Sequence, residues 1–169
     1  MPLWLVGVNV THVETIQRVK RSVQLMKDTA DMRAEAVAAE LQKVHTEEYS
    51  PRHYNHEQSL RGTIKLANFA YRDEYIQMEE LAGGTSYADI VYLPKRNSDY
   101  LALVIELKVR DKAHPERDAE GAIAQIKQHH YPDSIIKYMH DILLVGICYD
   151  KDNPEKKHTC KIECLGVGA

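Results

Sequence analysis

The chain has 169 residues, of which 44% are hydrophobic and 28% are charged, and its formal net charge is −3. This length suits one domain with a short extension, and the composition indicates neither a disordered chain nor a membrane span. The negative charge excludes a broadly basic nucleic-acid coat, so any DNA contact must be a local patch. Cys148, Cys160 and Cys164 form no CxxC pair. Their spacing disfavours a zinc site and predicts a reduced, cytoplasmic protein.

The first 50 residues predict an extension in front of the main domain. The apolar run 3–10 is too short to span a bilayer, and we interpret it as a strand. Apolar residues at helical intervals predict a first helix over about 12–27. A second helix is expected from a cap at Asp31 to the Ser50-Pro51 break. The sequence therefore divides into an N-terminal strand and helical extension over 1–50 and a main domain over 51–169.

The main domain alternates helical and strand-like patterns. The expected order is a helix capped by Asn55, three strands, a helix, and two further strands. The five strands are Tyr75–Leu81, Tyr87–Leu93, Tyr100–Val109, Asp141–Tyr149 and Thr159–Leu165, and the second helix covers about Glu116–Tyr131. This order predicts an α/β fold with a mixed central sheet.

Three charged side chains are expected to converge at one edge of this sheet. Glu106 and Lys108 project from the same face of a very apolar strand, and Asp89 lies in the strand expected to pair with it. Buried charges are costly, so they need a partner or a task. At an effective dielectric of about 20, two carboxylates roughly 4 Å apart repel by about 4 kcal/mol. A divalent cation would relieve this repulsion, and oxygen ligands favour magnesium or manganese.

The same residues carry a family resemblance. Ala88-Asp89-Ile90-Val91 followed by Ile105-Glu106-Leu107-Lys108 resembles the D…ExK signature of the PD-(D/E)XK nucleases. Gln125-Ile126 and Tyr131 are similar to the Q…Y helix of that superfamily. Within it, the chain most resembles the small C-terminal module of certain prokaryotic AAA-type ATPase proteins. Leu60 and Arg61 depart from that module, which often has Tyr and His there.

This resemblance implies a restriction-endonuclease-like αβββαβ core over about 55–165 and magnesium- or manganese-dependent hydrolysis of phosphodiester bonds in DNA. The metal ligands that it implies are Glu57, Asp89, Glu106 and the backbone carbonyl of Leu107. The catalytic residues that it implies are Asp89, Glu106, Lys108 and Gln125. Lys108 would assist the attacking water, and Gln125 would support the site. DNA and an AAA-type ATPase are the implied partners, and the sequence leaves open whether the protein is a monomer or a dimer.

Other interpretations compete with catalysis. The same fold could form a catalytically silent module that binds DNA or docks on an ATPase partner, and the three charges could form a structural salt bridge. A nucleotide-binding domain is disfavoured because no Gly-rich phosphate loop follows a strand. Glu57 could be a first-turn carboxylate favoured by the helix dipole, and Gln125 could border the buried stripe. His129 and His130 point to different sides of a helix, which predicts a surface pair and not a metal site.

Overall fold

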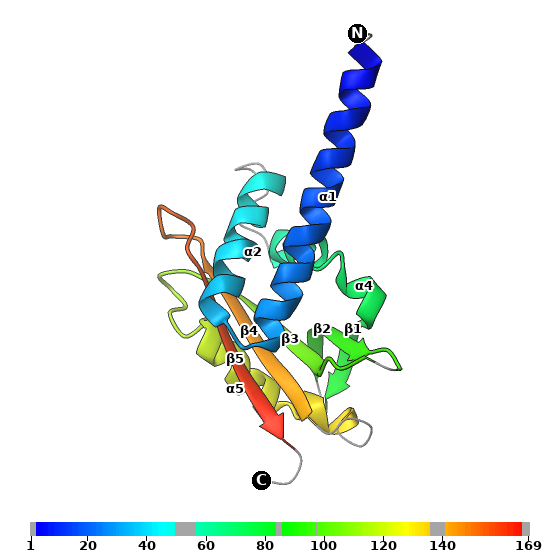
Figure 1. The fold of residues 1–169 in the computed structure, drawn as a ribbon. Helices are drawn as coiled ribbons and strands as arrows, with labels where there is room; N and C mark the ends of the chain where they lie inside the picture. The colour runs from blue at the N-terminus through cyan, green and yellow to red at the C-terminus, as the bar shows by residue number, and fades with distance from the viewer. Residues whose placement is uncertain (1–2, 50–56, 84–85, 97, 136–140, 167–169) are drawn as a thin grey trace.

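The computed structural model describes residues 3–49, 57–83, 86–96, 98–135 and 141–166 (Figure 1). In chain order the elements are α1 (Leu3–Ala30), α2 (Ala34–Glu48), α3 (Glu57–Ala67), α4 (Tyr71–Glu74), β1 (Tyr75–Gly83), β2 (Ser86–Pro94), β3 (Ala102–Arg110), α5 (Ala119–Gln128), the 3-10 helix η1 (Tyr131–Ser134), β4 (Asp141–Asp150) and β5 (His158–Gly166). The predicted order of helix, three strands, helix and two strands is confirmed.

The five strands form one mixed sheet in the order β1-β2-β3-β4-β5. The β3–β4 pair is parallel and the other neighbouring pairs are antiparallel. A parallel pair needs a crossover connection, and α5 lies between β3 and β4 in the chain to supply it. Residues 142–149 of β4 are all buried, which explains why this interior strand has a nearly continuous apolar sequence. The structure agrees with a restriction-endonuclease-like fold.

Helices cover both faces of the sheet, with α1 and α2 on one side and α5 on the other (Figure 1). Alternation along β3 divides its side chains between two apolar cores. Leu103, Ile105 and Leu107 pack in the core beneath α1, α2 and α3. Ala102 and Val104 pack in the core beneath α5. By the same alternation, the next even-numbered residues of β3 belong to the α5 side of the sheet.

The expectation of a strand over residues 3–10 is wrong, because α1 already begins at Leu3. A short apolar run does not distinguish a strand from a helix, and extending an existing helix adds one hydrogen bond per ordered residue. The C-terminal part of α1 buries Leu25 and Met26 against the body. Its N-terminal part projects away from the body (Figure 1), and Val13 and Ile16 are exposed. Within the described part of the chain, no helix is both long and apolar enough to cross a membrane.

Two expected helix boundaries also differ from the structure. Asp31 does not cap α2: its backbone N–H donates to the carbonyl of Lys27 at 2.9 Å and so completes the end of α1. Met32 then takes a positive φ of 58°, and α2 starts after Arg33 without a side-chain cap. The predicted cap Asn55 lies outside the described residues.

The helix expected over 116–131 is shorter than its apolar pattern suggests. Asp118 caps α5 by accepting a hydrogen bond from the N–H of Gly121 at 2.7 Å. At the other end, His130 has a φ of 56°, which breaks the helix before η1 starts at Tyr131. A side-chain cap and a left-handed residue therefore set the length of α5.

Gly146 allows α5 to lie very close to the sheet. A Cβ atom at this position would collide with the carbonyl oxygen of Ala119 and would lie 3.0 Å from the Cβ of Ala122. Gly146 is also the residue of β4 that pairs in register with Glu106 of β3. The close approach of helix and sheet thus occurs next to Glu106, and this packing brings α5 within reach of the acidic side chain.

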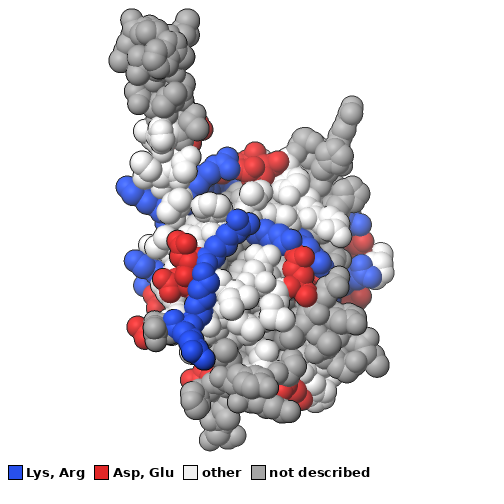
Figure 2. Space-filling model, turned by 90° about the vertical axis from the view of Figure 1, so that its right-hand side faces the viewer, with Lys and Arg blue, Asp and Glu red and all other residues white. Residues whose placement is uncertain are grey.

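The face of the molecule on the side of α4 and β1 mixes both signs of charge. Lys and Arg side chains form an arc around an uncharged area, with Asp and Glu side chains beside it (Figure 2). Nonspecific DNA affinity comes mainly from cations that neutralise phosphates. This face is therefore not a uniformly basic coat, in agreement with the negative net charge.

A buried histidine pair joins α2 to β5. His45 is 0% exposed and His158 is 4% exposed, and the distance between His45 Nδ1 and His158 Nε2 is 2.8 Å. His158 Nδ1 lies 2.8 Å from the carbonyl of Lys156, which can only accept, so Nδ1 carries the proton. Neutral His158 then accepts at Nε2 from His45. Burial, followed by the neighbouring His45, lowers the pKa of His158 from 6.5 to about 4.

The low pKa of His158 predicts that acid destabilises the fold. The unfolded chain binds a proton at this residue near pH 6.5, whereas the folded chain binds it only near pH 4. The stabilisation is therefore complete above pH 6.5 and is lost as the pH falls to about 4. Within this window the free energy of unfolding should fall by up to about 1.4 kcal/mol per pH unit. Melting temperatures of the wild type and His158→Gln, measured between pH 7 and pH 4, test this slope.

The exposed His130 provides a matched control, because its side chain is 73% accessible. His130→Gln should keep the wild-type pH dependence, whereas His158→Gln should flatten it. Equal slopes for the wild type and His158→Gln would show that this buried pair does not control acid stability.

Candidate active site

Asp89 lies where β2 and β3 stop pairing. The β2–β3 ladder contains the pairs Ile90–Ile105, Val91–Val104 and Tyr92–Leu103. Just beyond the end of this ladder, the carboxylate of Asp89 bonds to the backbone of β3. Its Oδ2 accepts a hydrogen bond from the N–H of Leu107 at 2.8 Å. This bond holds the Asp89 side chain against the backbone of β3, one residue after Glu106.

Glu106 is buried, with only 3% of its surface exposed, and it belongs to a polar cluster with Lys108 and Gln125. Its Oε1 accepts from Lys108 Nζ at 3.1 Å and also from the Gln125 side-chain amide. Lys108 Nζ in turn donates to Gln125 Oε1 at 2.5 Å. Each of the three side chains therefore contacts the other two. A buried carboxylate requires donors of this kind to offset the loss of its hydration.

A second cation, Arg61 of α3, contacts the other oxygen of Asp89. Its Nη2 donates to Asp89 Oδ1 at 2.6 Å, and the two side chains are 21% and 12% exposed. The sequence marked Arg61 only as a departure from a related module and did not predict it as a site residue. One signal was available, because residues four apart share a helix face, and Arg61 follows Glu57 at that interval.

The predicted site residues meet at one cleft of about 730 Å³. Asp89, Glu106 and Lys108 reach it from the sheet and Gln125 reaches it from α5. Further residues along the cleft are Leu107, Val109, Glu116, Arg117, Gly121, Ala124, Gln128 and His129. Glu57 is the first residue of α3, but its side chain lies outside the described residues. The structure therefore brings together all the predicted site residues except Glu57, whose side chain is not placed.

The donors in this cleft suit a hard divalent cation. Carboxylate oxygens come from Asp89 and Glu106, and Leu107, whose N–H is bonded to Asp89, also lines the cleft. Magnesium commonly takes one or two carboxylates and keeps several waters. A group of three or more His, Cys, Asp or Glu side chains able to hold a metal is absent from the described part of the chain. The described residues thus fit a magnesium site with two carboxylates, and not a site made of protein ligands alone.

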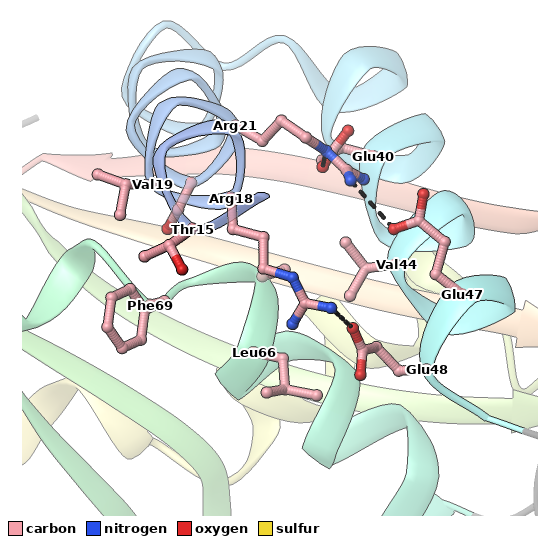
Figure 3. A pocket seen from close by; sticks show the side chains of 12 residues that line it. Thr15, Arg18, Val19, Arg21, Glu40, Val44, Glu47, Glu48, Leu66 and Phe69 are labelled. Atoms are coloured by element: carbon pink, nitrogen blue, oxygen red, sulfur yellow. Dashed lines mark hydrogen bonds and ion pairs between the residues drawn. The ribbon is translucent and has the colours of Figure 1, made fainter. Parts of the chain in front are cut away.

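A second hollow, of about 260 Å³, lies between α1, α2 and α3 (Figure 3). Ion pairs cross it from α1 to α2: Arg18–Glu48 at 2.9 Å, and Arg21 with Glu40 at 2.7 Å and Glu47 at 3.0 Å. The side chains of these carboxylates are 23% to 44% exposed, so unlike the buried Glu106 they remain accessible to water. The contacts connect the two helices and offer no acid–base pair. The cleft at Asp89 and Glu106 is therefore the stronger candidate for chemistry.

The comparison with protein families agrees with this geometry. A family model described as the PD-(D/E)XK nuclease superfamily matches residues 55–159, which is more than half of the chain. The matched segment includes Arg61, Asp89, Glu106, Lys108 and Gln125. No curated protein sequence matches the chain. The family match, the mixed sheet and the clustered D…ExK residues lead to one conclusion. This chain belongs to the PD-(D/E)XK nuclease superfamily.

Proposed function

We propose that this protein is a metal-dependent nuclease that hydrolyses phosphodiester bonds in DNA with magnesium or manganese. The observation that carries the proposal is the buried Glu106, which is bonded to Lys108 and Gln125 and lies beside Asp89 in one cleft. A chain that needed only a stable sheet would place apolar residues here, because a buried charge network is rarely better than apolar packing. Membership of the PD-(D/E)XK superfamily supports the same assignment.

In this proposal Asp89, Glu106 and the carbonyl of Leu107 hold the cation, and Glu57 adds a carboxylate from the start of α3. A divalent cation bound there polarises the scissile phosphate and lowers the pKa of a nearby water. The bond from Leu107 N–H to Asp89 Oδ2 fixes the orientation of one ligand before substrate binds. Gln125 fixes the other through its bond to Glu106. Preorganised ligands of this kind avoid reorganisation during the reaction.

Lys108 has a different role, because a protonated amine cannot bind a metal. Its Nζ is oriented by Glu106 and Gln125, and its side chain is 19% exposed to the cleft side of the sheet. From this position it would donate to the attacking water or to a phosphate oxygen. The negative charge on the phosphate increases as the water attacks, so the benefit of this cation belongs mainly to the transition state.

A second candidate function is a catalytically silent module that binds DNA or docks on an AAA-type ATPase partner. The ion pair between Arg61 and Asp89 favours it. With Lys108 beside Glu106, the described cluster already balances two carboxylates with two cations. We propose the cytoplasm as the location in either case, since a reducing compartment suits the free thiols Cys148, Cys160 and Cys164.

The first prediction from this proposal concerns the two carboxylates. Asp89→Asn and Glu106→Gln should each abolish metal-dependent DNA cleavage, because each removes a charged ligand while keeping a similar shape and a hydrogen-bond acceptor. The melting temperature should stay within a few degrees of the wild type. Glu120→Gln is the matched control, because this α5 carboxylate is 75% exposed. Cleavage near the wild-type rate by either cleft variant would exclude the site.

The second prediction concerns metal binding to the folded protein. Millimolar magnesium or manganese should raise the melting temperature of the wild type, because a ligand that binds only the folded state stabilises it. At a concentration of 100 Kd the gain is about 2.7 kcal/mol, which corresponds to several degrees for a domain of this size. Asp89→Asn and Glu106→Gln should lose most of the gain. A wild-type melting curve that ignores both ions would favour the silent module.

The third prediction separates catalysis by Lys108 from a structural role. Lys108→Met should reduce the cleavage rate by on the order of 10²–10³-fold while DNA affinity changes little, because the cation acts mainly in the transition state. A purely structural salt bridge predicts a loss of about 3–5 kcal/mol in unfolding free energy instead. Lys127→Met is the control, because this α5 cation is 53% exposed. An unfolded or fully active Lys108→Met protein would contradict the catalytic role.

A further inference from the structure

The carboxylate of Asp89 is bonded by the protein at both oxygens. Arg61 Nη2 contacts Oδ1 at 2.6 Å and the N–H of Leu107 contacts Oδ2 at 2.8 Å. The Leu107 donor is a neutral backbone group that a metal ligand can keep. The Arg61 donor is a permanent positive charge, and a divalent cation approaching Oδ1 would be repelled by it.

Burial strengthens this conflict. The side chains of Arg61 and Asp89 are 21% and 12% exposed, so solvent screens their charges less than it screens a surface pair. Lys108, whose side chain is 19% exposed, contributes a second positive charge next to the buried Glu106. The four groups together have a formal charge of zero. A site of this composition is stable without metal, but it attracts a cation much less than two uncompensated carboxylates would.

The two cations of the site lie on different elements of the fold. Lys108 lies on β3 two residues from Glu106, and its Nζ is also bonded to Gln125. Arg61 lies on α3, whose residues Leu60 and Ile64 pack in the core on the other face of the sheet from α5. Because Arg61 lies on α3 and both carboxylates lie on strands, displacing its guanidinium from Asp89 would not require β2 or β3 to change. Lys108 shares β3 with Glu106, so Arg61 is the better candidate for the cation that a metal displaces.

We propose that Arg61 is an exchangeable counter-ion of the metal site: it holds Asp89 in the metal-free protein and is displaced from Oδ1 when a divalent cation binds. This inference rests on the proposed function, because it takes Asp89 as a metal ligand. Arg61 is a positioning residue, and it sets the metal concentration at which the site fills. Below that concentration the ion pair keeps Asp89 in place.

The test compares manganese binding to the wild type, Arg61→Gln and Arg61→Lys, with free manganese measured by electron paramagnetic resonance and no DNA present. Arg61→Gln removes the competing charge, so its Kd for manganese should fall by tenfold or more. Arg61→Lys keeps the positive charge beside Asp89 and changes only the geometry of the ion pair. Its Kd for manganese should therefore stay within about threefold of the wild-type value. Arg72→Gln is the control, because Arg72 lies over the Phe69 ring, away from the cleft, and it should not change the Kd.

A melting experiment separates this role from a structural one. Metal-free Arg61→Gln should melt below the wild type, and saturating manganese should restore more of its stability than it adds to the wild type. A lower melting temperature with an unchanged or weaker manganese affinity would overturn the proposal and leave Arg61 as a structural residue.

If Arg61→Gln does not fold, the wild type decides by nuclear magnetic resonance. The guanidinium N–H signals of Arg61, assigned by their loss in Arg61→Lys, should exchange slowly with water and lose this protection when magnesium binds. Unchanged protection in the magnesium-bound protein would overturn the exchange.

If neither the wild type nor Arg61→Gln binds manganese, the proposed metal site fails as well. If the wild type binds manganese and cleaves DNA but Arg61→Gln binds no tighter, only the role of Arg61 fails.

Discussion

The burial of one carboxylate, that of Glu106, constrains the packing around the site. A charge with 3% exposure costs several kcal/mol unless donors surround it, and β3 itself supplies Lys108. A further donor, Gln125, comes from α5 and must lie within hydrogen-bond distance. That distance requires α5 to pack closely on the sheet, and Gly146, which pairs with Glu106 on β4, permits this packing. The glycine, the crossover helix and the acidic residue therefore depend on one another.

Asp89 provides a hydrogen-bond acceptor for a backbone N–H of β3 where the β2–β3 pairing ends. The registered pairs between β2 and β3 extend only as far as Ile90 and Ile105, and the N–H of Leu107 beyond them bonds to the Asp89 carboxylate. An unpaired buried N–H is expensive, so the side chain replaces a missing strand partner. Arg61 then balances the charge from the helical layer on the other side of the sheet. The site thus lies where a break in backbone pairing lets the two layers meet.

The sequence predicted most of this arrangement because its signals are local. Alternation along β3 places Glu106 and Lys108 on one face, and continuous apolar runs identify the buried strands. The contact between Arg61 and Asp89 was missed because it joins residues 28 positions apart on different elements. The start of α1 at Leu3 was missed because an apolar run of eight residues fits a strand or a helix equally well. The sequence therefore did not predict features that depend on tertiary contacts or on an apolar run with no clear period.

The charge balance of the site also indicates a physical difference between a nuclease and a silent module. With Arg61 and Lys108 opposite Asp89 and Glu106, folding does not require a metal, so a stable metal-free protein is compatible with either function. The proposed catalysis requires the two cations to behave differently, because Lys108 would remain for the reaction and Arg61 would yield to the metal. Lys108 lies on the same strand as Glu106 and is bonded to it and to Gln125 of α5. Arg61 lies on α3 in the opposite layer, so in the proposed exchange it is the cation that yields, and a silent module would have no need of this asymmetry.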